Sequence, residues 1–312
     1  MAEQAAEFGR IVERMRVDRG IVGFAYPTFR RRYDARDTIL YALGVGAGER
    51  EDELHLVYER DLTALPSVPV APPYAALAGM HDRLGIDLSS VLHGEQRLRL
   101  HRAVPVEGEM SVDARVSAVW DKGEHAIVDT TAEVRVDGEH LATAVYSSFI
   151  RGGGGFGGER GRGLRAPARD RPPDVVLTER THTGQARLYR LSGDDNPLHV
   201  DPQFARRAGF DRPILHGLCT YGYAVRMALP AIAGGDPARV RRADARFTDV
   251  VYPGDELRLE LWHTGPAEVS ARVLVPAREA VVIDPIELSA LPAMNPGARD
   301  SPTSEIDSKG AP

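Results

Sequence analysis

Six consecutive residues, Asp194 to His199, place a carboxylate, a carboxamide and an imidazole in one short stretch. Gly193 before them and Pro197 among them are turn residues, because glycine permits positive φ and proline fixes its own φ. We therefore expect a tight loop on which Asp194 and His199 reach one small molecule, such as a water, with Asn196 as a third contact. Acid–base chemistry on water needs such a pair, since one group takes a proton from water while another supplies one to carbon. The structural alternative is an Asx turn whose histidine bonds to the following helix.

The signals after this loop predict where the next helix begins and ends. Asp201 suits the N-cap, Pro202 the first helical position, and Gly209 the position just beyond the end. No helix is expected to start before Asp201, so the reactive side chains belong to the loop that feeds this helix.

A second helix is predicted to open at His216-Gly217 and to stop at Pro230. Residues 214–229 are apolar on nearly every face, which indicates a buried helix. The first N–H groups of a helix lack partners within it, and the helix dipole favours negative charge there. Because Gly217 has no side chain, an oxygen can approach its N–H closely, which makes it a candidate oxyanion hole. The alternative is a buried helix that begins with glycine for close packing.

These residues resemble a known family. The pattern Tyr189-x-Leu191-Ser192-Gly193-Asp194-x-Asn196-Pro197-Leu198-His199, with Ala205 after five more residues, is similar to the signature of the hydratase 2 group. This group comprises the (R)-specific 2-enoyl-CoA hydratases of the MaoC-like hot-dog superfamily. Further segments resemble the hydratase domain of the peroxisomal multifunctional enzyme type 2. They are residues 91–96, 153–158, 213–220 and 245–247.

The resemblance implies reversible hydration of trans-2-enoyl-CoA to (R)-3-hydroxyacyl-CoA. In the roles we expect, His199 takes a proton from water, Asp194 gives one to C2, Asn196 orients the water and the Gly217 N–H holds the thioester oxygen. The two proton roles could be exchanged, because the sequence fixes proximity and not direction. The motif contains no suitable metal ligand set and the reaction transfers no electrons, so we expect neither a metal ion nor a redox cofactor; CoA is part of the substrate.

The resemblance also implies a set of residues that contact the acyl-CoA substrate. They are His93, Gly94, Lys122, Asp195, Pro197, Leu198 and Phe247. Lys122 is expected in a hairpin turn, where its ammonium either meets a CoA phosphate or is simply solvated. The alternatives for His93 and Phe247 are a strand-end histidine bonded to backbone and a core aromatic.

Two other functions remain open from the sequence. A hot-dog acyl-CoA thioesterase would need an acid or base aimed at the carbonyl carbon, whereas the motif suits attack at C3. A non-catalytic acyl-CoA-binding subunit is favoured by an incomplete motif, and here the motif is complete.

Composition narrows the class of protein. The 312 residues carry a net charge of -6 and no long basic face alternating with aromatics, which argues against a nucleic-acid partner. No apolar run approaches a membrane span. The single cysteine, Cys219, excludes an internal disulfide and is interpreted as a core residue. With neither a secretory signal nor a peroxisomal Ser-Lys-Leu terminus, we expect the cytoplasm. Family analogy implies a homodimer.

The elements that position the loop form two similar halves. Residues 1–150 are predicted to be a degenerate hot-dog half and residues 174–290 the catalytic half, joined by an extended, mobile Gly/Arg/Pro-rich linker, residues 151–173. The tail, 291–312, has too few apolar residues to pack and is expected to be disordered. Helices are predicted near 38–46 and within 70–84. Strands are predicted near 96–101, 109–120, 125–136, 139–150, 242–251, 255–262, 268–275 and 280–284. Helices on antiparallel sheets give an α+β protein, and with the resemblance a double hot-dog fold.

Overall fold

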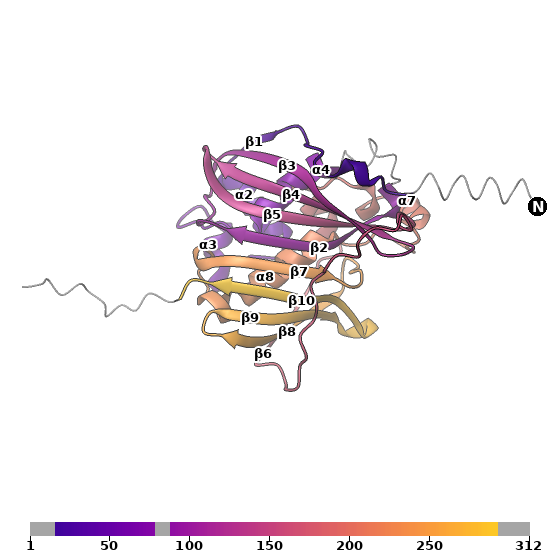
Figure 1. Ribbon diagram of the computed structural model, residues 1–312. Coiled ribbons are helices and arrows are strands. Elements are labelled where there is room, and N and C mark those ends of the chain that lie inside the picture. The colour runs from indigo at the N-terminus through magenta and orange to yellow at the C-terminus, as the bar shows by residue number, and fades with distance from the viewer. Residues whose placement is uncertain (1–15, 79–87, 293–312) are drawn as a thin grey trace, which may run out of the picture.

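The computed structural model describes residues 16–78 and 88–292. In these residues ten strands form one antiparallel sheet in the order β1-β3-β4-β5-β2-β7-β10-β9-β8-β6 (Figure 1). The strands are β1 Phe29–Tyr33, β2 Val91–Leu100, β3 Gly108–Asp121, β4 Ala126–Val136, β5 Glu139–Ile150, β6 Val175–Arg180, β7 Val240–Phe247, β8 Glu256–Gly265, β9 Glu268–Val275 and β10 Ala280–Ala290. The tail was predicted to be disordered from residue 291, and its residues beyond 292 lie outside the described part of the chain.

The two halves of this sheet repeat one topology. From edge to centre the first half runs β1-β3-β4-β5-β2, and the second runs β6-β8-β9-β10-β7. The central strands β2 and β7 pair antiparallel, from Glu95 opposite Arg246 to Arg99 opposite Arg242, and join the halves into one sheet. Each strand thus has a counterpart of the same rank in the other half, which supports an internal duplication. The α+β double hot-dog prediction is confirmed.

Six α-helices accompany the sheet in the described residues, and the longest of them packs against β7, β8, β9 and β10. The six helices are α2 Ala35–Gly44, α3 Leu54–Val57, α4 Ala71–Ala78, α6 Gln185–Tyr189, α7 Pro202–Arg207 and α8 Gly217–Ala233. Fourteen of the seventeen residues of α8 are buried, which confirms the all-round apolar pattern seen in its sequence. Figure 1 shows α8 behind β7 and β10. No helix in residues 16–78 and 88–292 is both long and apolar enough to cross a membrane.

Several element boundaries differ from the prediction. The edge strands β1 and β6 were not predicted. The sequence of β1 is Phe-Arg-Arg-Arg-Tyr, and its run of charged side chains, which is usual on an exposed edge, lacks the apolar alternation by which a strand is predicted. Strand β10 continues through Pro285 with an irregular register. Helix α8 continues past Pro230 to Ala233, where Gly234 in the left-handed region ends it. Pro230 forfeits one hydrogen bond, and burial of Ile232 and Ala233 offsets that loss.

The linker is extended, as predicted, and most of its residues are exposed, but hydrogen bonds and an ion pair attach it to the sheet. Figure 1 shows it crossing the face opposite α8, from the end of β5 to β6. Near its start, the Asp121 carboxylate accepts N–H bonds from Gly155 at 3.1 Å and Gly157 at 2.6 Å. Further on, Arg169 pairs with Asp284 at 2.7 Å, and its guanidinium carbon lies 4.7 Å from the Trp262 ring centroid.

A buried arginine ties α8 to both halves. The Arg226 guanidinium donates to Glu53, of the first half, and to Glu179, on β6. Its Nε also donates to the Val45 carbonyl at 3.0 Å. The guanidinium is compensated by two carboxylates, so removing it leaves both acids without their partner in a low-dielectric site.

Arg226→Ala is therefore expected to lower the free energy of unfolding by ~3–5 kcal/mol. The exposed pair Arg180–Glu256 is the matched control, and Arg180→Ala should cost about 1 kcal/mol or less. Urea unfolding of the two variants measures both values. Similar losses in the two variants would contradict the role given to Arg226.

Candidate active site

The loop of residues 193–199 folds through its own short-range hydrogen bonds. Gly193 has φ 131°, a conformation that favours glycine. Asp194 Oδ1 then accepts the Asn196 N–H at 3.2 Å, and Asn196 Oδ1 accepts the Leu198 N–H at 3.0 Å, which is an Asx turn. A 3₁₀ turn over Pro197–His199 follows, so helical backbone begins earlier than predicted.

The helix after the loop agrees with its sequence signals. Asp201 caps α7, where its carboxylate accepts the Gln203 N–H at 2.7 Å. Pro202 is the first helical residue and Gly209 lies just past the end. The cap at Asp201 sets the end of the loop and so restrains the backbone of His199, two residues earlier in the chain.

His199 is held as a neutral imidazole with a defined tautomer. Its side chain is buried, and Nδ1 lies 2.9 Å from the Ile214 carbonyl oxygen. A carbonyl only accepts, so Nδ1 donates and Nε2 keeps its lone pair. Burial lowers the pKa of His199 to about 4. Near neutral pH, Nε2 is thus a proton acceptor.

The pKa of Asp194 is shifted in the opposite direction. It is 5% exposed and lines the same cavity as His199. Burial raises the pKa of its carboxyl from its ordinary value to about 7, and the N–H of Asn196 opposes this only in part. Near neutral pH a substantial fraction of Asp194 carries a proton. A proton acceptor and a proton donor therefore lie together, a pairing typical of acid–base sites.

Gly217 is the first residue of α8, as predicted, with His216 at the N-cap. A methyl group added at Gly217 would lie 3.4 Å from the Phe247 ring, in the space between the helix start and β7. Both residues line the cavity. The N–H of Gly217, which has no partner within the helix, therefore lies at the cavity wall.

The cavity has a volume of about 310 Å³ and draws on both halves of the chain. Eight of the predicted site residues line it: Asp194, Asn196, Leu198, His199, Gly217, His93, Gly94 and Phe247. The other three, Asp195, Pro197 and Lys122, do not. The exposed side chain of Asp195 lies outside, although its neighbours on both sides are lining residues.

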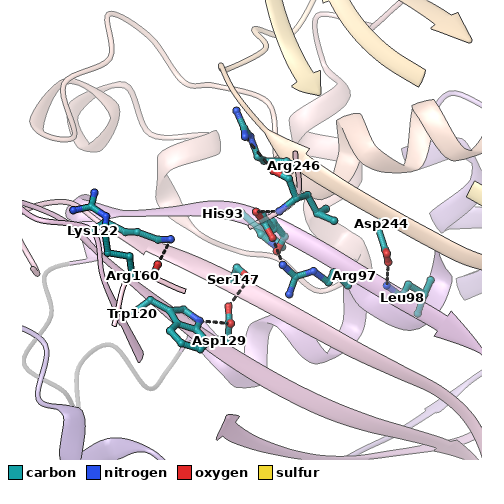
Figure 2. A network of polar contacts seen from close by, with 12 residues as sticks. His93, Arg97, Leu98, Trp120, Lys122, Asp129, Ser147, Arg160, Asp244 and Arg246 are labelled. Atoms are coloured by element: carbon teal, nitrogen blue, oxygen red, sulfur yellow. Dashed lines mark hydrogen bonds and ion pairs between the residues drawn. The ribbon is translucent and has the colours of Figure 1, made fainter. Parts of the chain in front are cut away.

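Lys122 lies apart from this cavity. It follows β3 in a hairpin turn, as predicted, and its ammonium donates to the Arg160 carbonyl of the linker (Figure 2). In Figure 2, His93 and Lys122 lie well apart. Contact between Lys122 and a CoA phosphate stays a prediction.

The first half supplies an aromatic wall. His93 Nε2 donates to the Glu95 carbonyl at 3.0 Å, which agrees with the strand-end alternative, while its ring also lines the cavity. The ring of Tyr74, on α4, stacks on His93 at 5.6 Å with 8° between the planes, and the Phe247 ring lies 5.0 Å away. Burial lowers the pKa of His93 to about 4. Tyr74 was not found from the sequence, since nothing local distinguishes it from a core aromatic.

His216 is the second residue that the sequence interpretation missed. It was taken only as the residue that opens α8, yet its ring stacks on that of His199. Its position directly before Gly217 was the available signal. Among the described residues, oxygen and nitrogen atoms of Asp194, His199 and His216 lie within 4.8 Å of one another. His199 Nδ1 and His216 Nε2 each donate to a backbone carbonyl, and the lone pairs on the other ring nitrogens lie in two planes only 29° apart. The arrangement therefore suits proton transfer better than a shared metal ion.

Comparisons with known proteins cover both halves. Residues 31–152 match the MFE-2 hydratase 2 N-terminal domain, and residues 165–282 match the MaoC like domain. The peroxisomal multifunctional enzyme type 2 of Mus musculus is 40% identical over 79% of this chain, but the chain spans only 35% of that protein. Enoyl-CoA hydratase 2, peroxisomal, of Arabidopsis thaliana is 38% identical over 77% of this chain and 84% of its own length.

A solved structure supports the same family assignment. A MaoC-like dehydratase from Phytophthora capsici superposes with a TM-score of 0.80 and 30% identity, over 89% of this chain and 98% of that one. The two family models together cover the loop of residues 193–199, α8, Tyr74 and His93. The chain belongs to the MaoC-like hydratase 2 family.

Proposed function

We propose that this protein is a hydro-lyase that reversibly adds water to a trans-2-enoyl-CoA to give an (R)-3-hydroxyacyl-CoA. The observation that carries the proposal is the pairing of neutral His199 with protonatable Asp194 at one cavity, beside the N-terminus of α8. The relative from A. thaliana is named an enoyl-CoA hydratase, which supports the same reaction. The (R) configuration rests on the resemblance to the hydratase 2 group.

The residues act in sequence on one bound water. His199 Nε2 takes a proton as the water oxygen bonds to C3, and the π electrons of the double bond move toward the thioester oxygen. The Gly217 N–H stabilises the charge on that oxygen. Asp194 then gives its proton to C2, and the thioester carbonyl is restored. Transfer of the proton from His199 back to Asp194, directly or through solvent, resets the pair.

The wall residues position the substrate. His93, Gly94, Leu198 and Phe247 line the cavity and are proposed to hold the acyl thioester. The Asn196 Oδ1 is already bonded to the Leu198 N–H, so its NH₂ group is the part left to orient the water. CoA enters as part of the substrate, and no separate cofactor takes part in these steps.

One assay separates this function from its alternatives. Purified protein is mixed with crotonyl-CoA, decenoyl-CoA and a bulky branched enoyl-CoA, while enoyl-thioester absorbance and free thiol are followed together. Loss of absorbance without thiol, with an (R) product, is expected. Thiol release would instead indicate a thioesterase. Absence of any reaction would favour an acyl-CoA-binding subunit.

Gly217→Ala tests the oxyanion position. The added methyl meets the Phe247 ring at ordinary contact distance, so the fold should tolerate it. The methyl nevertheless blocks approach of the thioester oxygen, and kcat should fall by ~10²-fold. Gly222→Ala on the same helix is the contrasting variant, because its methyl would overlap the Val45 side chain and should lower Tm. Unchanged kcat in Gly217→Ala would contradict the assignment.

Assembly and compartment stay predictions. The homodimer rests on family analogy alone. The names of the mouse and A. thaliana relatives include the word peroxisomal, so the cytoplasmic expectation is not supported by them. Size-exclusion chromatography with light scattering, and localisation of the tagged chain in its own cells, would decide the two questions.

A further inference from the structure

The His216 side chain contacts both members of the acid–base pair. It is fully buried, with 0% exposure, at the N-cap of α8. Its Nε2 lies 3.1 Å from the Asp194 carbonyl oxygen and donates to it. Its ring stacks on the His199 ring, with 3.7 Å between centroids and 29° between planes. One imidazole thus makes a backbone contact to the acid and a face contact to the base.

The two contacts restrain different motions. The hydrogen bond holds the carbonyl of Asp194, and so the backbone from which its carboxyl extends into the cavity. The stack limits tilting of the His199 ring, whereas the His199 bond to the Ile214 carbonyl limits its movement within the ring plane. His216 itself is fixed at the start of α8, where its own carbonyl accepts the Cys219 N–H at 3.1 Å. A rigid helix end thereby supports a loop.

The imidazole ring of a histidine satisfies both contacts at once. Phenylalanine would retain a flat ring without the N–H, and asparagine would retain a donor without the ring. Burial and the adjacent His199 lower the pKa of His216 well below its ordinary value, which keeps the ring uncharged against His199. The other groups facing it are Asp194, the Tyr189 ring at 4.9 Å and the charge of Arg190.

We propose that His216 is a positioning residue that sets the geometry of Asp194 and His199 through its Nε2–H bond and its ring stack. The proposal rests on the proposed function for its kinetic consequences, but the two contacts can be tested without turnover. Misplacement of a catalytic group by about 1 Å typically costs ~10²-fold in rate. A supporting residue of this kind therefore changes kcat more than KM.

The first test is kinetic and uses the full chain with the matched variants His216→Phe and His216→Asn. Each should lower kcat by ~10-fold or more while KM changes by less than about threefold. The exposed His182→Asn is the control and should leave kcat unchanged. In a double-mutant cycle, His216→Phe should add little to the loss already caused by Asp194→Asn, because it acts through that residue. Wild-type kcat in both folded variants, or fully additive losses in the cycle, would overturn the proposal.

The second test does not depend on activity. The His199 ring nitrogens are followed by NMR against pH, with His199→Gln used for assignment. In His216→Asn, loss of the stacked ring admits solvent, and the pKa of His199 should rise toward its ordinary value. In His216→Phe the ring remains, and the His199 titration should stay close to that of the wild type. If His216→Asn fails to fold, kcat of His216→Phe and its double-mutant cycle with Asp194→Asn decide the question. Identical His199 titration in wild type and His216→Asn would overturn the proposal even if no hydratase activity were found.

Discussion

Replacing His199 by alanine is expected to lower kcat/KM for enoyl-CoA hydration by ~10²-fold or more. The reason is the loss of Nε2, the neutral proton acceptor that the Nδ1–H bond to the Ile214 carbonyl leaves available. The substrate walls stay in place, so KM should change less than kcat. Purified variant and wild type are compared with the same enoyl-CoA, with circular dichroism to confirm that both are folded.

The pH dependence sharpens this test. The pKa of His199 is lowered to about 4, so the wild-type base is already deprotonated at pH 6, and an acid limb should appear only near pH 4. His199→Ala should lose this limb together with its rate. His182→Ala, at an exposed histidine, serves as the control and should keep both. Near-wild-type turnover in His199→Ala would contradict the role of His199 as the base.

The parts of the site that the sequence predicts correctly are those set by neighbours in the chain. Turn residues, the Asp201 cap and Pro202 at the helix start act over a few positions, and the structure has each where the pattern predicts it. The apolar pattern of α8 is likewise sufficient to indicate its burial. These signals fix the loop and the helix start, and so bring Asp194, His199 and Gly217 to one cavity.

The parts that the sequence does not reveal depend on distant contacts. Tyr74 meets His93 because α4 folds back on β2, and no local pattern encodes that approach. Pro230 would end an exposed helix, but burial carries α8 past it. The linker has the composition of a mobile chain, yet the Asp121 carboxylate accepts hydrogen bonds from the N–H groups of Gly155 and Gly157. The opposite pKa shifts of Asp194 and His199 likewise arise from burial that only the folded chain creates.

Asp194→Asn is expected to lower hydration turnover by ~10²-fold or more, because asparagine has the shape of the acid without a proton to give to C2. In the wild type the carboxyl has a pKa of about 7, so its proton is present below that pH and lost above it. The wild-type hydration rate should therefore fall as pH rises through about 7. The residual rate of the variant should lack this limb. Asp211→Asn, at an exposed position of the next loop, is the control and should retain it.

The same substitution should stabilise the protein at alkaline pH. An unfolded aspartate ionises near pH ~4, whereas folded Asp194 ionises near about 7. Between these values the unfolded chain releases a proton that the folded chain keeps, so the free energy of unfolding of the wild type falls as pH rises through this window. Asparagine removes that dependence. Asp194→Asn should thus match the wild type near pH 4 and exceed its Tm near pH 8, while being far less active. A variant that is less stable than the wild type at pH 8 would show that the Asp194 carboxylate is not held in an unfavourable buried position. The assignment of Asp194 as the proton donor would then fail.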